Sequence, residues 1–248
     1  MKALLTALRC EKGDVAGNLA RHIELLSEGA AAGARIVAFP EMSLTGSVDA
    51  LHWPGHAIPV DDDAVAALAD ATAHTGVAAL FGIAEAVGGE VRIAQLLADR
   101  GRVVGHYQKR TLGEDEDGYG AGSTVAEGFV IDGAPVGVAI CAEAGSDGPF
   151  DDAAAARARV VFLCSAPGLY GRRVDETGWR AGYDWWSGSV LTDAARHARA
   201  HGLWIALSTQ AGATADEDFP GLAALVNPAG EVVARTPDWR EAMLLVDV

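Results

Sequence analysis

The chain has 248 residues, half of them hydrophobic, which suits a single domain with a large core. Its formal net charge of −15 disfavours nucleic acids and anionic membranes as partners, because both bind clustered lysine and arginine side chains. The three cysteines are an odd number without CxxC spacing, so we expect neither a disulfide framework nor a metal site. The apolar segment 2–8 is too short for a signal peptide, and no segment is long enough to cross a bilayer. A reduced, working thiol would then fit a cytoplasmic location.

Runs of apolar residues bounded by turn-forming residues predict strands throughout the chain. We expect strands over 2–8, 36–41, 77–83, 91–98, 102–107, 124–131, 135–140, 160–164, 203–208, 222–226, 231–234 and 243–248. Helical spacing predicts a first helix that begins at a cap residue, Asn18, and ends at Gly33. Further helices are expected after the acidic run 61–63, which suits a helix N-terminus better than a metal site, and over 151–159 and 187–201. Segments 110–123 and 165–184 are expected to be loops.

Strands and helices alternate along the chain, but hairpins interrupt the alternation. Their turns are expected at 99–101, 132–133 and 227–230. This pattern favours mixed sheets with helices on the outside. Because there is neither a linker nor a fixed-period repeat, we expect one domain spanning 1–248.

Three chemically reactive side chains each stand at the end of a different predicted strand. Glu41 ends the run 36–41, Lys109 follows the strand 102–107, and Cys141 follows the strand 135–140. In α/β sheets, ligands meet catalytic groups just outside the carboxyl ends of strands. A carboxylate can take the proton of a thiol and an ammonium group can stabilise an oxyanion, so the three types form a complete acyl-transfer site. Taken singly, each has a structural alternative: a capping or exposed carboxylate, a surface lysine and a core cysteine.

These three segments resemble the motifs of the carbon–nitrogen hydrolase, or nitrilase, superfamily. The glutamate motif resembles 38–41 (Ala-Phe-Pro-Glu), the lysine motif 107–109 (Tyr-Gln-Lys) and the cysteine motif 137–141 (Gly-Val-Ala-Ile-Cys). The resemblance covers nearly the whole chain. It implies an α/β fold, a four-layer α-β-β-α sandwich with two mixed β-sheets. It also implies an amidase-like hydrolase without a cofactor, which acts on a small-molecule amide and assembles as a homodimer or higher homo-oligomer.

The resemblance also implies a role for each site residue. Cys141 would be the nucleophile and Glu41 the general base, while Lys109 and the backbone N–H of Ala142 would hold the oxyanion. Many members of the family carry a second glutamate that orients substrate, and Glu116 fits this position best. Its competitors in the same loop, which could also be a solvated acidic loop, are Glu114, Asp115 and Asp117. The other residues assigned to oxyanion or substrate binding are Glu143, Tyr119 and Pro167.

The sequence departs from the family pattern around the pocket. Cys-Ala-Glu at 141–143 replaces the usual Cys-Tyr-Asp, the segment 145–150 replaces Arg-Phe-Pro-Glu, and Thr209 stands where asparagine is usual. These changes bear on the substrate more than on Glu41, Lys109 and Cys141. The resemblance implies a small amide or N-carbamoyl substrate, with a nitrile as the alternative. A catalytically silent binding protein is the alternative from another class. Cys164 is expected in a strand core. Four aromatic residues could line the pocket or pack at a dimer interface: Trp179, Tyr183, Trp185 and Trp186.

Overall fold

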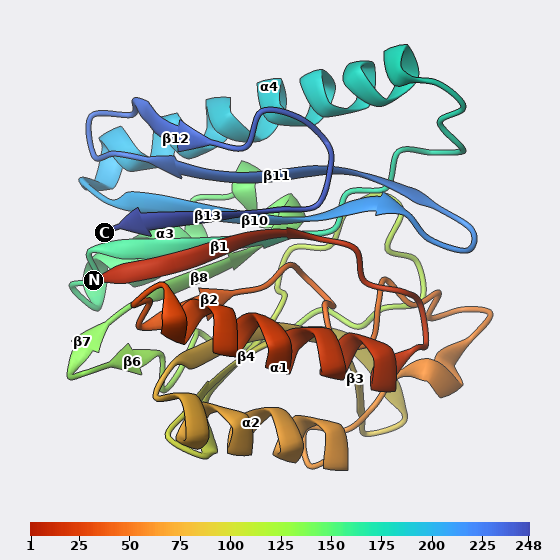
Figure 1. The fold of residues 1–248 in the computed structure, drawn as a ribbon, viewed down its shortest axis with the longest axis horizontal. Coiled ribbons are helices and arrows are strands. Elements are labelled where there is room, and N and C mark those ends of the chain that lie inside the picture. The colour runs from red at the N-terminus through yellow and green to blue at the C-terminus, as the bar shows by residue number, and fades with distance from the viewer.

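The computed structural model describes residues 1–248, and its strands form two sheets that face each other (Figure 1). The strands of the first sheet are β1 (Lys2–Leu8), β2 (Ile36–Ala38), β3 (Ala78–Val87), β4 (Glu90–Asp99), β5 (Arg102–Gln108) and β13 (Ala242–Asp247). Those of the second are β8 (Gly137–Ile140), β9 (Val160–Ser165), β10 (Trp204–Ala213), β11 (Asp218–Val226) and β12 (Val232–Arg235). A separate two-stranded ribbon pairs β6 (Val130–Ile131) with β7 (Ala134–Pro135).

Both sheets are mixed, and one pairing between two inner strands joins them. The order of the first is β13-β1-β2-β3-β4-β5, and that of the second is β12-β11-β10-β9-β8. The junction is a short parallel pairing of β1 with β10, in which Ala7 lies opposite Thr209 and Leu8 opposite Gln210. The far edges, β5 and β8, are not paired with each other.

Helices cover the outer face of each sheet, which gives the four α-β-β-α layers that were predicted (Figure 1). Helices α1 (Val15–Ala31) and α2 (Asp63–Thr75) cover the first sheet, and α3 (Gly148–Ala155) and α4 (Glu176–His201) cover the second. Two short 3₁₀ turns span Pro54–His56 and Cys141–Gly145. No helix in the structure combines the length and the apolar composition of a membrane span.

Three apolar clusters hold the layers together. One strand can contribute to two of them, because alternate residues of a strand point to opposite faces of its sheet. In β1, Leu5 enters the cluster of 26 buried residues between the sheets, whereas Leu4 enters the cluster of 20 beneath α1 and α2. A third cluster, also of 20 residues, packs the second sheet against α3 and α4. Cys164 is fully buried between the sheets, as expected of a strand core residue.

The first and last long helices begin earlier than the sequence predicted. Helix α1 is capped by Asp14, whose carboxylate accepts a 3.0 Å hydrogen bond from Gly17 N–H. Asn18 is inside the helix and donates to backbone oxygens of Glu11 and Leu44. Helix α4 begins within the predicted loop 165–184, capped by Asp175. The glycines and aromatic residues of its first turns obscured the helical spacing.

The predicted hairpin 124–131/135–140 is wrong in both strands, since only 130–131 of the first is a strand and the second does not pair with it beyond the turn. Only the β6–β7 ribbon forms at the turn, followed by one further backbone hydrogen bond of 2.9 Å from the Val136 N–H to the Phe129 carbonyl. After it, β8 leaves the hairpin and pairs in parallel with β9, with Ile140 opposite Cys164. The strand that carries the nucleophile candidate therefore belongs to the second sheet.

Candidate active site

The Glu41 carboxylate lies beyond the end of β2, in a segment that is fixed from several sides. The backbone oxygen of Glu41 accepts a 2.9 Å hydrogen bond from the Gln210 side chain on β10. The following residue, Met42, has a positive φ of 49°. Gly82 of β3 makes this close approach possible, because a Cβ there would lie 2.2 Å from the Met42 nitrogen. The Glu41 side chain is thereby held in the interior at 1 % exposure.

Lys109 follows β5 and points at the same carboxylate. Its backbone N–H bonds to Ile93 of β4, and its side chain is fully buried. The Nζ atom lies 2.8 Å from Glu41 Oε1 and also contacts a carboxylate oxygen of Glu116. Glu116 is oriented in turn by the Gly113 N–H, at 2.6 Å. Of the four acidic residues in this loop, Glu116 is therefore the one that contacts Lys109, as predicted for the second glutamate.

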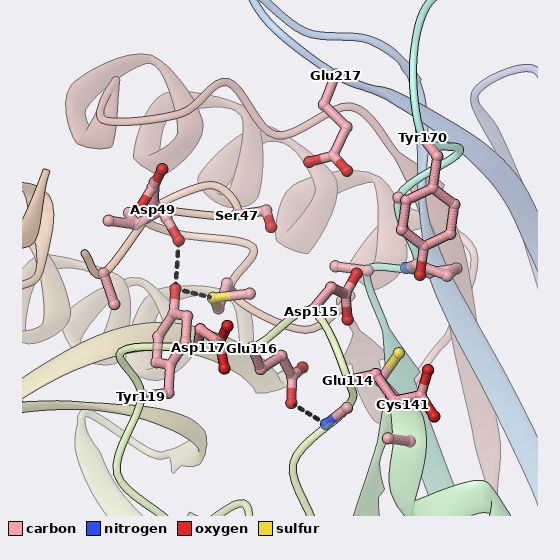
Figure 2. Close-up of a pocket in the computed structure, with 18 of the residues that line it drawn as sticks. Ser47, Asp49, Glu114, Asp115, Glu116, Asp117, Tyr119, Cys141, Tyr170 and Glu217 are labelled. Carbon is pink, nitrogen blue, oxygen red and sulfur yellow. Dashed lines mark hydrogen bonds between the residues drawn. The ribbon is translucent and has the colours of Figure 1, made fainter. Parts of the chain in front are cut away.

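Cys141 stands at the turn that follows β8, the first residue of a 3₁₀ turn. Its φ of 45° is unusual for a residue with a side chain and turns the chain sharply at the strand end. Cys141 is half-buried and lines a cavity of about 610 Å³, a size typical of small-molecule sites. Figure 2 shows the thiol in this cavity with Glu114, Asp115 and Tyr170.

The charges around Cys141 set the proton affinities of the three groups. Burial raises the pKa of Glu41 to about 7, and the Glu116 carboxylate also raises it. The Lys109 ammonium lowers this pKa but does not outweigh burial. Burial and the Glu41 charge raise the pKa of the Cys141 thiol well above its usual range. Burial lowers the pKa of Lys109, but the carboxylates of Glu41 and Glu116 outweigh it and the net shift is upward. The resting site therefore holds the Cys141 thiol, the Lys109 ammonium ion and a Glu41 carboxyl group whose pKa lies near neutral pH.

The cavity wall contains several of the predicted binding residues. Ala142, Tyr119 and Pro167 line it, and the Tyr119 hydroxyl contacts the Val48 carbonyl and the Met42 sulfur. Glu41 and Lys109 lie behind this wall, in contact with the lining residues Ala166 and Glu116. The wall is acidic, and its carboxylates are Asp49, Glu114, Asp115, Glu116, Asp117, Asp193 and Glu217.

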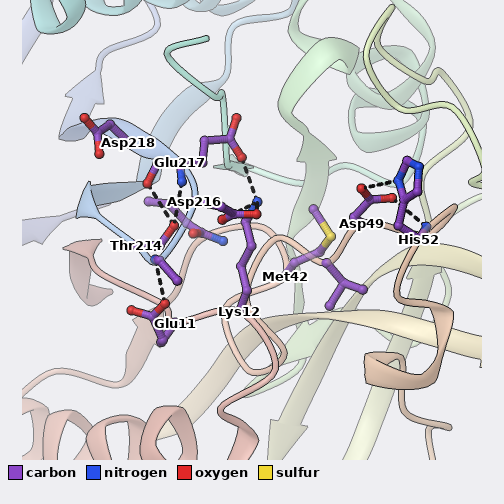
Figure 3. Close-up of polar contacts among 12 residues, drawn as sticks. Glu11, Lys12, Met42, Asp49, His52, Thr214, Asp216, Glu217 and Asp218 are labelled. Atoms are coloured by element: carbon purple, nitrogen blue, oxygen red, sulfur yellow. Dashed lines mark hydrogen bonds and ion pairs between the residues drawn. The ribbon is translucent and has the colours of Figure 1, made fainter. Parts of the chain in front are cut away.

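Among the residues that line the cavity, Lys12 is the one lysine or arginine. Lys12 forms ion pairs with Glu217 at 3.0 Å and with Asp216 at 3.1 Å (Figure 3). These pairs tie the segment after β1 to the tip of the β10–β11 hairpin. On another part of the wall, Asp49 binds the His52 ring at 2.7 Å. Both contacts hold loops of the rim in place.

Two sequence expectations are corrected here. Glu143 does not line the cavity: it is fully buried and its carboxylate accepts hydrogen bonds from backbone and tyrosine donors. Of the four aromatic residues, Trp185 and Trp186 line the cavity, whereas Tyr183 and Trp179 pack in the core beneath α4. Trp185 and Trp186 lie on α4, just before the predicted start of this helix at residue 187.

The carbon-nitrogen hydrolase family model matches residues 5–248. The chain belongs to the carbon-nitrogen hydrolase family. A search of curated proteins found no match for it.

Solved structures of other carbon-nitrogen hydrolases have the same fold. A cysteine-to-alanine mutant of the Nesterenkonia AN1 amidase, from the nitrilase superfamily, is 21 % identical, with a TM-score of 0.83 over 100 % of this chain and 90 % of that one. A glutamate-to-glutamine mutant of the Nesterenkonia sp. AN1 amidase shows Michael addition of acrylamide at its active-site cysteine. It is 21 % identical, with a TM-score of 0.82 over 100 % of this chain and 93 % of that one. These likenesses confirm the predicted fold.

Sequence reasoning missed one group that contacts Glu41. The backbone N–H of Ala166, just after β9, donates a 2.8 Å hydrogen bond to Glu41 Oε2. Together with Lys109 on Oε1, it gives both carboxylate oxygens of Glu41 a hydrogen-bond partner. The sequence does not mark this donor by residue type, because any residue but proline has a backbone N–H. Its place directly after the buried strand β9 is a signal that the sequence contains, since site residues gather at the carboxyl ends of strands.

Proposed function

We propose that this protein hydrolyses a small amide or N-carbamoyl compound through a thioester acyl-enzyme on Cys141. The observation that carries the proposal is the buried contact of Lys109 with Glu41 and Glu116 behind a cavity lined by a thiol. Desolvating three charged groups is costly, and a purely structural core would be as stable with apolar residues. Such an arrangement is typical of a site that moves protons.

Acylation begins when Glu41 takes the Cys141 proton as the sulfur attacks the substrate carbonyl carbon. Lys109 and the Ala142 N–H stabilise the oxygen anion of the tetrahedral intermediate. Protonated Glu41 then gives its proton to the leaving nitrogen, the C–N bond breaks, and ammonia or an amine departs. The acyl group remains on sulfur as a thioester.

Deacylation reuses the same groups. Glu41 takes a proton from water, whose oxygen attacks the thioester carbonyl, and Lys109 again stabilises the oxyanion. The C–S bond breaks and the thiolate recovers its proton from Glu41, which releases a carboxylic or carbamic acid. A pKa near 7 suits Glu41 for both directions of transfer, because the group is then neither too weak a base nor too weak an acid at neutral pH. No cofactor or metal takes part in these steps.

Ammonia release from a panel of small amides, carbamoyl compounds and nitriles tests the proposal. We expect release from one or more amides or carbamoyl compounds by the wild type, and none by Cys141→Ala. Release from nitriles alone would make the protein a nitrilase. Release from no compound, with folded protein, would favour a binding protein on the same scaffold. Amides are favoured because the similar structures are of proteins named amidases.

The proposal also includes a reducing, cytoplasmic setting and assembly as a homodimer or larger homo-oligomer. The first follows from the need to keep Cys141 reduced. The second is suggested by large apolar side chains that remain exposed around the cavity mouth, among them Leu51 and Trp185. Sedimentation equilibrium measures the assembly state directly, and a monomer at all concentrations would contradict it.

A further inference from the structure

We propose that Glu143 is a positioning residue that fixes the nucleophile turn against the segment carrying Lys109. The inference rests on the proposed function, in which Cys141 and Lys109 act on the same carbonyl group. In this role Glu143 neither binds substrate nor transfers a proton. The role follows from where its carboxylate lies and from what it joins.

The Glu143 carboxylate is fully buried and accepts four hydrogen bonds. Oε2 accepts from the Ile140 N–H at 2.9 Å. Oε1 accepts from the Tyr107 hydroxyl at 2.6 Å and from the Arg110 N–H at 2.7 Å, with a longer contact of 3.4 Å to the Thr111 N–H. All four partners are donors, so only a group with two acceptor oxygens satisfies them.

These donors flank the two catalytic side chains in sequence. Ile140 immediately precedes Cys141, and Arg110 immediately follows Lys109. The Glu143 carboxylate therefore holds the backbone directly before Cys141 and the backbone directly after Lys109. The Ile140 bond also closes the turn in which Cys141 adopts its positive φ.

The position of this contact in the fold explains why such a tie is needed. Lys109 follows β5 at the far edge of the first sheet, and Cys141 follows β8 at the far edge of the second. Strand pairing joins the sheets only through β1 and β10, which are separated from β5 and β8 by other strands of each sheet. Glu143 connects the unpaired edges where the reacting groups meet, and bonds to a carboxylate are stronger than those to a neutral acceptor.

The experiment compares Glu143→Gln with a matched control. Gln keeps the size but replaces one acceptor oxygen by an amide NH2 group, a donor that faces N–H or O–H donors. We expect kcat to fall about 10²-fold with KM nearly unchanged, because small misplacements of reacting groups have effects of that size. The rate of Cys141 alkylation by iodoacetamide should also change, and this readout does not depend on the substrate. Glu143→Asp, which keeps the charge, should recover part of kcat.

The control is Glu85→Gln, which removes another buried carboxylate next to β5. Glu85 accepts from the His106 ring at 2.9 Å and from Gln108 at 2.8 Å, and it lines no part of the cavity. We expect this variant to lose stability but to keep wild-type kcat and wild-type alkylation of Cys141. If both variants lowered kcat equally, or if folded Glu143→Gln kept wild-type kcat and alkylation, the inference would be overturned.

A second variant decides the matter if Glu143→Gln does not fold. Tyr107→Phe removes one donor to Glu143 and keeps the ring in the core. Loss of a hydrogen bond to a charged group corresponds to about a tenfold change, so kcat should fall by about that factor at constant KM. Unchanged kcat and alkylation in folded Tyr107→Phe would contradict the inference. If the wild type hydrolysed nothing, the proposed function would fail, while the alkylation rates would still test Glu143.

Discussion

Lys109 Nζ and Glu41 Oε1 are 2.8 Å apart in the interior of the protein, with the two side chains 0 % and 1 % exposed. Solvent does not screen this ion pair, so each partner depends on the other for its charge. A buried pair that loses one member leaves an uncompensated charge. The relationship predicts what replacement of either residue does to turnover.

Glu41→Gln should lower kcat/KM by about 10²–10⁴-fold, because it keeps the shape of the base and removes its proton affinity. Lys109→Met should lower it by about 10²–10³-fold, as for other oxyanion donors. The double variant should be little worse than the worse single one, since groups that act as a unit are not additive. The measurement is kcat/KM of all four proteins on one accepted amide, with circular dichroism as the folding control. Near-wild-type turnover by either folded single variant would make that residue a structural charge.

The pH dependence should follow the ionisation of Glu41. Its raised pKa of about 7 means that the base is protonated and inactive at low pH, so kcat/KM should rise with pH through about 7. Glu116→Gln removes a negative charge that raises this pKa, and the rising limb should move to lower pH. A full pH profile of both proteins checks the direction. A limb that stayed in place or moved upward would show that Glu116 does not act on the base.

The three cysteines should differ sharply in reactivity. Cys141 lines the cavity, whereas Cys10 and Cys164 are 0 % exposed. Iodoacetamide should therefore modify Cys141 first, and activity should disappear in proportion to that modification. Peptide mass mapping at several times of labelling measures both. Full activity of protein alkylated at Cys141 would remove it from the mechanism.

Gly82→Ala should damage the site without touching a catalytic side chain. A Cβ at Gly82 would press on the backbone of Glu41 and Met42, which forces a shift that costs about 1–3 kcal/mol of stability. We expect a lower melting temperature and lower kcat. Gly188→Ala in α4 is the control, because an added Cβ there meets nothing within 4 Å and helix propensity favours alanine. Equal behaviour of the two variants would mean that the close approach at Gly82 does not hold the base.

The sequence predicted which reactive side chains lie together better than it predicted the residues that hold them. Glu41, Lys109 and Cys141 follow separate apolar runs whose carboxyl ends converge, and each stands in a segment that resembles a family motif. The choice of Glu116 among the loop carboxylates came from the family resemblance, because no periodicity describes the backbone of 113–116. The tie made by Glu143 required knowledge that β5 and β8 lie at facing edges of two sheets.

Fold predictions failed where local signals competed. Glycines and aromatic residues over 176–188 are typical of loops, yet this segment is the N-terminal half of α4, and burial of Tyr183 and Trp186 against the second sheet stabilises it as a helix. At the first helix, Asn18 was a plausible cap. Asp14 takes that position because Asn18 is used to bind the segment before the helix and Leu44.

The central claim is a thioester on Cys141, and rapid acid quench during turnover of an accepted amide tests it most directly. Peptide mass mapping of the quenched wild type should find the acyl group of the substrate on the peptide that contains Cys141. It should find none on the peptides with Cys10 or Cys164, and Cys141→Ala should carry no acyl group and release no ammonia. Ammonia release by Cys141→Ala at the wild-type rate would contradict the account.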